Sequence, residues 1–473
     1  MSAPTHTASL FGGAIGVLQQ LANELMSRVT VQVGPLPDVP IGDVIDTRRG
    51  AARDAADAVE VLLDALRGRH DVDPQRARAT RPLLLDTTVQ GSSSGTSTRL
   101  VVDADAPDAG WGTAGRESAM VAVYVDGVYH STIVVLHERS EPYEVNLGEL
   151  PAGGHRVELR AATDVAPTMP VVRSASARVT SGDEALVDRY APVFVMRDCD
   201  TGERNSSSRS DAPLLMTPAI THHPDGSRTI EYRVVLSNED GGTAPPDLLA
   251  KFGRTIDAEP LYRVTIDADG RVTDEQYQSP VHRWLAFDGE HHGARPILRV
   301  STANNLVSAR PGLRGAERWS DAAIDIIAPE TSDHEVMRAH PWTWRVMALE
   351  LLREGRTAAA DAVRGARQIG DPRRYVFLGP LDDAARAAIA AAGGLVLVLA
   401  DGSRVLAKIA KGFAAGDFHQ SALELPDGAA TDAVRGVADL DVSAVVLDAD
   451  LSMRVLRPAA RESAGVRGAY VRA

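Results

Sequence analysis

The sequence predicts a multidomain, mainly β protein: two β-sandwiches, a helical N-terminal segment and a C-terminal α+β domain. The chain has 473 residues, enough for about three domains. Strand-length segments rich in Val, Thr and Tyr, separated by polar turns, fill residues 83–178 and 183–318. Helical periodicity occupies residues 1–80 and returns within residues 319–473.

The helical N-terminal segment is predicted from spacing. In the run that begins at Arg48, apolar residues recur alternately four and three positions apart, as one helix face requires. These residues are Ala52, Ala56, Val59, Leu63 and Leu66. A second helix is expected from Leu10 to Val29, with a Pro- and Gly-rich connection between the two. We expect a hairpin that packs on the body or makes homo-oligomers.

The first β segment predicts an immunoglobulin-like sandwich. About seven strands fit into it, and Asp126-Gly127 is the strongest hairpin signal, because a two-residue turn of that type needs positive φ. Its last hairpin, LPAGGHRVELRA, resembles those of bacterial immunoglobulin-like accessory modules, which bind carbohydrate or act as spacers. The second β segment has longer polar loops, where binding groups are usually found.

Composition excludes several functions. Acidic residues outnumber basic ones by 64 to 50, and the resulting net charge of -14 argues against a nucleic acid partner. The single cysteine, Cys199, excludes an internal disulfide framework and a thiolate zinc cluster. No apolar run approaches the roughly 20 residues of a transmembrane helix. No basic leader precedes the first apolar run, so we expect a cytoplasmic protein, or else a secreted one whose leader has been removed.

Catalytic motifs are few. The sequence has no Walker loop, no GxGxxG that opens a helix after a strand and no HExxH. Residues 91–95 satisfy GxSxG, but they lie between two strands, which favours a hairpin loop over a nucleophile elbow. The pairs His222-His223 and His291-His292 are expected in solvated turns. Trp342 and Trp344 precede an amphipathic helix, and core packing between domains is their favoured role.

Asp257 and Glu259 are the most informative pair. In an extended segment their spacing places both carboxylates on one face, where they repel each other unless a cation or an arginine lies between them. Calcium, magnesium and manganese all prefer such oxygen ligands. The alternative is a salt bridge to Arg254 or Arg263. Further oxygen donors in the preceding loop are Asn238, Glu239 and Asp240.

Four features in residues 188–315 carry a family resemblance. They are Arg189–Phe194 (RYAPVF), Gly253–Glu259 (GRTIDAE), His282 and Ile297–Asn305. In this order they resemble the β-sandwich core shared by the vacuolar-protein-sorting sixty-two-type family and the necrosis- and ethylene-inducing peptide-like proteins. The resemblance implies that Asp257 and Glu259 match an acidic pair, which in the toxin branch helps to hold a divalent cation near a sugar-headgroup site. It also implies that His282 matches a histidine near that site.

This chain departs from the family motif at three positions. Arg254 and Ile256 stand where the motif has histidines, and Ala258 stands where it has tryptophan. Arginine stays protonated and cannot ligate a metal. It could instead pair with Asp257 and replace the charge of the cation.

The resulting expectation is non-catalytic binding of a glycan or polar lipid headgroup. A divalent cation (calcium, magnesium or manganese) would sit on Asp257 and Glu259. The expected ligand-binding residues are Arg254, His282, Asn304 and Asn305. One alternative is a hydrolase of a glycoside or phosphoester, with Glu259 or Asp257 as general base and His282 as its partner. A second alternative is an assembly protein.

Overall fold

The mainly β class is confirmed by the computed structural model, which also carries several short helices. It describes residues 73–91, 95–195, 199–200, 205–206, 212–237, 239, 244–279, 282–300, 305–309, 318–319, 323–358, 368–409 and 420–458. Most of the predicted N-terminal helical segment therefore lies outside the described residues, which begin just before helix α3 (Pro74–Ala77). Among the described residues, no helix is long and apolar enough to span a bilayer.

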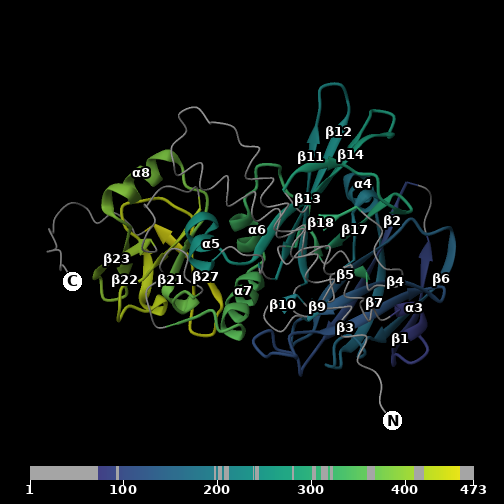
Figure 1. The fold of residues 1–473 in the computed structure, drawn as a ribbon, viewed down its shortest axis with the longest axis horizontal. Coiled ribbons are helices and arrows are strands. Elements are labelled where there is room, and N and C mark those ends of the chain that lie inside the picture. Colours follow the sequence, from purple (N-terminus) through teal and green to yellow (C-terminus); the bar gives the residue numbers. More distant parts are fainter. Residues whose placement is uncertain are drawn as a thin grey trace, which may run out of the picture.

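The first β-region consists of two sheets that pack on each other, with strand orders β1-β6-β3-β4 and β5-β2-β7 (Figure 1). Their strands are β1 (Leu83–Gly91), β2 (Ser97–Asp105), β3 (Ala119–Val125), β4 (Val128–Val135), β5 (Glu141–Gly148), β6 (Gly153–Ala161) and β7 (Val171–Thr180). Leu100, Val121 and Leu159 belong to the apolar core between the sheets. The hairpin predicted at Asp126-Gly127 is confirmed, because both residues have positive φ, at 50° and 81°.

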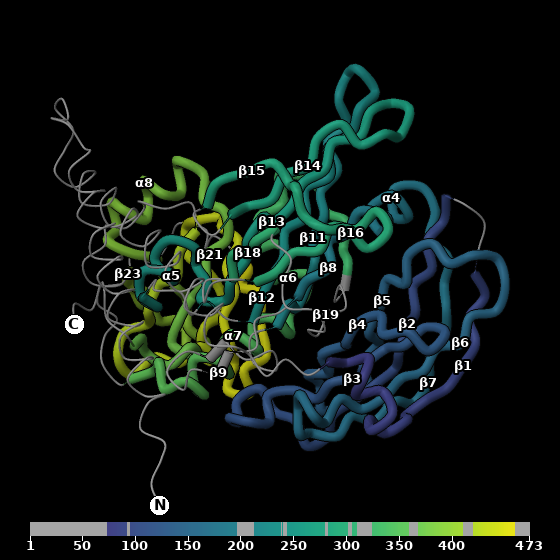
Figure 2. The backbone as a smooth tube through the Cα atoms, turned by 45° about the vertical axis from the view of Figure 1, so that its right-hand side comes forward, coloured from purple at the N-terminus to yellow at the C-terminus, as the bar shows by residue number. Residues whose placement is uncertain are grey.

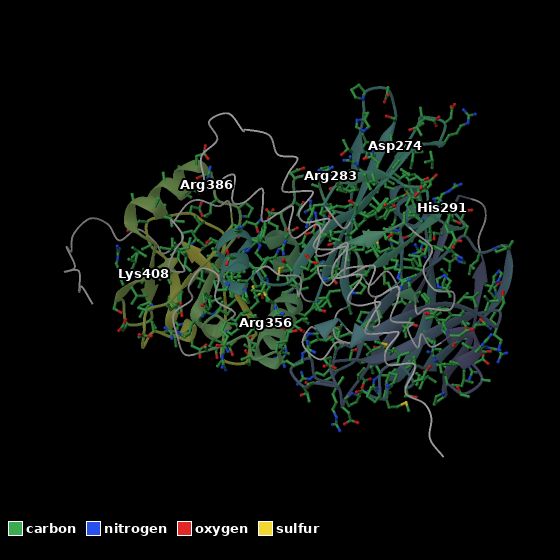
Figure 3. All side chains as sticks on the ribbon, viewed as in Figure 1. Asp274, Arg283, His291, Arg356, Arg386 and Lys408 are labelled. Carbon is green, nitrogen blue, oxygen red and sulfur yellow. The ribbon has the colours of Figure 1, made fainter. Side chains whose placement is uncertain are left out.

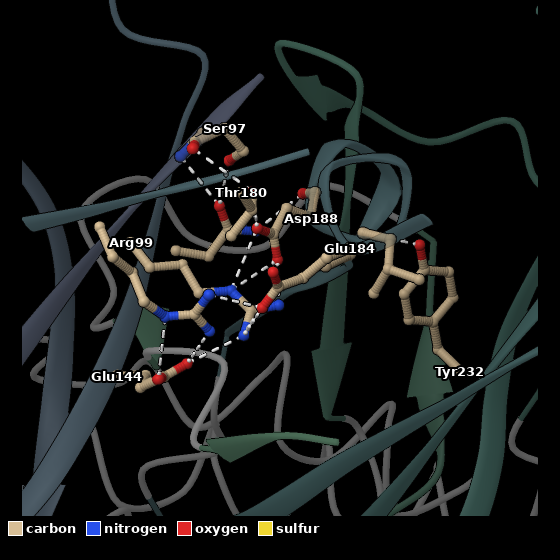
Figure 4. A network of polar contacts seen from close by, with 12 residues as sticks. Ser97, Arg99, Glu144, Thr180, Glu184, Asp188 and Tyr232 are labelled. Atoms are coloured by element: carbon tan, nitrogen blue, oxygen red, sulfur yellow. Dashed lines mark hydrogen bonds and ion pairs between the residues drawn. The ribbon is translucent and has the colours of Figure 1, made fainter. Parts of the chain in front are cut away.

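Helix α4 (Gly182–Tyr190) is fixed to the first β-region by buried ion pairs (Figure 4). The Arg99 guanidinium on β2 donates to Asp188 on α4 at 2.6 Å and to Glu144 on β5 at 2.9 Å. The Arg99 and Asp188 side chains are only 2% and 0% exposed. The Thr180 hydroxyl completes the network by donating to Asp188 at 2.8 Å.

The middle sheet has the strand order β15-β14-β13-β12-β11-β20. Its strands are β11 (Pro213–His222), β12 (Arg228–Leu236), β13 (Asp257–Ile266), β14 (Val272–Gln278), β15 (Trp284–Ala286) and β20 (Ala323–Ile324). The tips of the β11–β12 and β13–β14 hairpins project from the body (Figures 1 and 2). One face packs into the main core through residues such as Ile230 and Tyr232, while the other is polar, a division typical of antiparallel sheets.

The remaining strands of residues 183–318 extend a sheet of the first β-region. Its order continues from β4 through β19, β8 and β17 to β16, with β18 also paired to β17. Their bounds are β8 (Val193–Val195), β16 (His291–His292), β17 (Arg295–Val300), β18 (Val307–Ser308) and β19 (Arg318–Trp319); β9 (Cys199–Asp200) and β10 (Asn205–Ser206) pair separately. The chain segment expected to form a second sandwich thus divides its strands between this shared sheet and the middle sheet.

The C-terminal part contains helices and a closed barrel, the C-terminal barrel, with strand order β21-β24-β23-β22-β25-β27-β26. Its strands are β21 (Tyr375–Leu378), β22 (Leu395–Leu399), β23 (Arg404–Ile409), β24 (Ser421–Glu424), β25 (Val434–Val437), β26 (Ala444–Leu447) and β27 (Met453–Pro458). The helices are α6 (Asp333–Ala339), α7 (Trp342–Arg353), α8 (Asp383–Ala392) and two 3₁₀ turns, Pro372–Arg374 and Thr431–Ala433. A capping box between Ser332 and Glu335 starts α6.

Besides the separate cores of the first β-region and the C-terminal barrel, one larger apolar core joins these parts. It runs from Trp111 in the first β-region, through the middle sheet, to Leu451 beside the C-terminal barrel. Trp344 on α7 is fully buried, with its ring centroid 5.0 Å from that of Phe377 on β21. Trp342 meets His137 of the first β-region at 5.4 Å. The packing role predicted for the two tryptophans therefore agrees with the structure.

Candidate functional site

A bulge in β13 sets the direction of the two predicted acids. The β12–β13 register shifts after Tyr232, so Tyr232 pairs with Tyr262 while Val234 pairs with Glu259 and Leu236 with Asp257. Partners on antiparallel strands project to the same face. Asp257 and Glu259 consequently share a face of the middle sheet, as their spacing predicted, and this is the face that continues into the core at Tyr262.

Arg254 is held beside the acids by a tight turn. Helix α5 (Pro245–Phe252) ends at Gly253, whose φ is 64°. A Cβ atom there would lie 3.1 Å from the Leu378 carbonyl oxygen and 2.9 Å from that of Ser421, so glycine permits this close approach to the C-terminal barrel. The Arg254 side chain that follows is 7% exposed.

The predicted pairing of Arg254 with Asp257 needs correction. Its guanidinium donates to Asp333 Oδ2 on α6 at 2.9 Å, and also to the backbone carbonyls of Ile256 and Ala258. It still interacts electrostatically with Asp257. The other arginine considered for the salt bridge, Arg263, instead donates to Gln276. The sequence could not indicate Asp333, because this residue is 79 positions away from Arg254.

Asp257 is almost completely buried, with 1% of its surface exposed. Burial, together with the nearby carboxylates of Glu259 and Glu239, raises the pKa of Asp257 well above its usual range. The buried amide of Asn305 donates to Asp257 Oδ2 at 3.1 Å. Asn305, predicted as a ligand-binding residue, therefore binds the Asp257 carboxyl group inside the protein. Asn304, the other predicted asparagine, lies outside the described residues.

Glu259 is partly buried at the edge of the same group. Burial raises the pKa of Glu259 to about 7, although the guanidinium of Arg254 acts in the opposite direction. The Gln278 carboxamide lies against it, and in the orientation that satisfies both groups its nitrogen donates to Glu259 Oε2 at 2.9 Å. Glu239, Asp257, Glu259 and Asp333 are called the acidic cluster below.

The positive charge that faces the acidic cluster comes from arginine side chains. Arg254 and Arg233 both donate to Asp333, at 2.9 and 3.1 Å. Within the described residues, no group of three or more His, Cys, Asp or Glu side chains could hold a metal ion. Calcium prefers about six to eight oxygen ligands. The described residues therefore do not form the predicted divalent-cation site at Asp257 and Glu259, and Asn238 and Asp240 lie outside the described residues.

The predicted site residue His282 lies in a different environment. It is exposed on the turn between β14 and β15, with φ 53°, and its backbone N–H donates to the Ser279 carbonyl oxygen at 2.9 Å. Trp284 follows two residues later at the start of β15. Of the predicted site residues, Asp257 and Glu259 therefore belong to the acidic cluster, and Arg254 and Asn305 lie beside it. His282 lies on an exposed turn near Trp284.

Trp284 belongs to a row of partly exposed polar side chains that the sequence did not single out. The Arg263 guanidinium carbon lies 4.2 Å from the Trp284 ring centroid. Gln276 Oε1 accepts from Arg263 Nε at 2.9 Å, and Gln276 Nε2 donates to Asp274 Oδ2 at 2.7 Å. In Figure 3, Asp274 is labelled among the side chains that stand out from this part of the molecule. We call Asp274, Gln276, Arg263 and Trp284 the polar row.

The polar row occupies the outer face of the middle sheet. Arg263 pairs with Gln276 and with Glu231, and Thr265 pairs with Asp274, so these residues share a face. All are partly or fully exposed. Alternation of polar and apolar residues along β12 and β13 was the signal for this face, but Trp284 joins it only through strand pairing.

The two histidine pairs do not converge. His291 Nε2 lies 2.9 Å from Glu275 Oε1, while the ring of His292 meets His130 of the first β-region at 6.2 Å. His223 Nε2 contacts the Thr229 hydroxyl at 2.9 Å. Their geometry gives no support to a shared metal. No family model, curated protein or solved structure matches this chain.

Proposed function

We propose that this protein binds a glycan on the outer face of the middle sheet, at the polar row. The observation that carries the proposal is the stacking of the Arg263 guanidinium 4.2 Å from the Trp284 ring centroid, with Gln276 fixing the guanidinium from β14. The proposal keeps the ligand class expected from the sequence. It moves the contact residues from the acidic cluster to the neighbouring strands.

The chemistry of the polar row matches that of a sugar ring. A pyranose offers C–H groups on its faces and hydroxyl groups around its edge. An indole supplies a large, rigid apolar surface. Guanidinium and carboxamide groups supply planar donors, and carboxylates supply acceptors. Trp284, Arg263, Gln276 and Asp274 bring these functions together on three adjacent strands.

Accessibility supports this placement over the one first expected. Asp257 is 1% exposed and Arg254 is 5% exposed, so a ligand could reach them only if the protein opened. Arg263, Gln276 and Trp284 are partly exposed, and Asp274 is exposed. His282, whose contact with ligand was expected beside Asp257 and Glu259, lies two residues from Trp284, and we place it at the rim of the polar row. The hydrolase alternative would need Asp257 or Glu259 to reach substrate together with His282, and no observation favours it.

Removing the Trp284 ring is expected to weaken glycan binding at least tenfold. The full-length protein is first screened on an immobilised panel of neutral and acidic glycans, and the best one is titrated against wild type and Trp284→Ala. The lost stacking surface is worth more than the roughly 1.4 kcal/mol that corresponds to a tenfold change. Arg271→Ala is the matched control, because Arg271 is 76% exposed at the tip of the β13–β14 hairpin. Absence of binding across the panel, or equal affinity of wild type and Trp284→Ala, refutes the proposal.

A further inference from the structure

The acidic cluster lies where the middle sheet meets the C-terminal part, and its position does not depend on the glycan proposal. Glu239 follows β12, Asp257 and Glu259 begin β13, and Asp333 begins α6. The turn that carries Arg254 touches β21 and β24 through Gly253. The next residue, Thr255, donates its backbone N–H to Met347 Sδ on α7 at 3.4 Å. The end of β12, the start of β13, helices α6 and α7 and two strands of the C-terminal barrel therefore meet near these carboxyl groups.

Among the described residues, the carboxyl groups of this junction outnumber the guanidinium groups that reach it. Four carboxyl groups face the guanidinium groups of Arg254 and Arg233. Both arginines bond to Asp333. A third arginine, Arg356, reaches the junction and donates to the backbone carbonyl of Glu239 at 3.3 Å. Neutral Asn305 and Gln278 face Asp257 and Glu259.

Like charges this close cannot all stay ionised in a buried site. Asp257 and Glu259 share one face of β13 at alternate positions, and Asp257, which is 1% exposed, cannot reach solvent. In such surroundings the neutral, protonated form of a carboxyl group is favoured over the charged form. The guanidinium of Arg254 offsets part of this tendency but is held by Asp333.

We propose that Asp257 and Glu259 together keep one proton in the folded protein, and that its release at higher pH loosens the junction between the middle sheet and the C-terminal part. The proton acts as a latch: while it is bound, one of the two carboxyl groups carries no charge and does not repel the other. When it leaves, the two carboxylates repel each other across the junction. The elements nearest to the cluster, α5 and α6, are those expected to open first.

The direction of the pH dependence follows from proton linkage. Burial is the main cause of the raised pKa of both acids. It raises the pKa of Glu259 to about 7, and the carboxylate of Glu259 adds to the effect of burial on the pKa of Asp257. Groups with a raised pKa bind more protons when folded than when unfolded. Their contribution is therefore complete below their unfolded pKa and is lost as pH rises through the folded value. Asp257 and Glu259 therefore keep the proton in mild acid and release it toward alkaline pH, where the junction loosens.

The test compares urea unfolding of full-length wild type and Glu259→Gln between about pH 5 and about pH 8. The amide imitates a permanently protonated acid. We expect the unfolding constant of wild type, divided by that of the variant, to rise about tenfold for each pH unit between the unfolded and the folded pKa of the pair, where the folded protein keeps a proton that the unfolded chain has lost. Hydrogen exchange should show faster opening of α5 and α6 at the higher pH in wild type only. A ratio that stays constant with pH overturns the proposal.

Two further variants keep the test decisive. Glu330→Gln removes an exposed carboxyl group just before α6 and should titrate like wild type. If Glu259→Gln does not fold, Asp257→Asn replaces it, because loss of either acid removes the repulsion. Infrared spectroscopy of the folded wild type should show a protonated carboxyl band near pH 6 that is lost as the pH rises. Absence of that band from wild type near pH 6 refutes the latch.

Discussion

Arg99→Met is expected to destabilise the protein by about 3–5 kcal/mol, because it leaves the Asp188 carboxylate buried without its guanidinium partner. The two side chains are 2% and 0% exposed, and the bond between them is 2.6 Å long. Thr180 can offer Asp188 one hydroxyl donor but no charge. Urea unfolding followed by circular dichroism measures the change in the free energy of unfolding.

A double variant separates charge burial from packing. Arg99→Met with Asp188→Leu removes both charges and should lose less stability than Arg99→Met alone, since replacing a whole buried pair costs little. The exposed pair of Arg271 and Asp269, 76% and 72% exposed, supplies the control. Arg271→Met should change the free energy of unfolding by less than about 1 kcal/mol. An equal effect of Arg99→Met and Arg271→Met contradicts the interpretation of Figure 4 as a buried network.

Trp344→Ala is expected to cost about 3–5 kcal/mol, the usual range for removing a large aromatic side chain from a core. Trp344 is 0% exposed and packs between His334 and Phe377, at ring centroid distances of 5.4 and 5.0 Å. The cavity would open between α7 and the C-terminal barrel. Thermal and urea unfolding of the variant measure the loss.

The neighbouring tryptophan gives the comparison for this prediction. Trp342 belongs to the same helix but is only partly buried against His137. Trp342→Ala should therefore cost clearly less than Trp344→Ala. Trp344→Phe, which keeps most of the buried ring, should recover more than half of the lost stability. If the two alanine variants are equally stable, the full burial of Trp344 does not make it more important for stability than Trp342.

Local patterns predicted much of the fold. The turn at Asp126-Gly127 needs only two residues with positive φ, and short-range chemistry is enough to show it. The common face of Asp257 and Glu259 also follows from a spacing of two. Pairing between distant strands could not be predicted in the same way. Nothing local indicates that Trp319 pairs with Thr132, or that the C-terminal strands close into a barrel.

The candidate site shows the same limit. The sequence indicated that an arginine could neutralise the acids, and Arg254 does lie among them. Its direct partner, Asp333, comes from a helix that no spacing rule connects to β13. The burial of these side chains could not be predicted either, because the sequence does not show which loop is covered by another part of the chain. The polar row remained unnoticed since Arg263, Gln276 and Trp284 come from three strands.

The continuous core has a practical consequence for dissecting the molecule. Composition suggests a cut near residue 318, where strands give way to helices. A fragment that stopped there would lack α7, whose Glu350 accepts from Trp111 Nε1 and whose Arg353 pairs with Glu117, at 2.5 and 2.7 Å. Both partners belong to the first β-region. Such a truncated product would expose apolar surface at its new end, so recombinant fragments should keep this helix or be expected to aggregate.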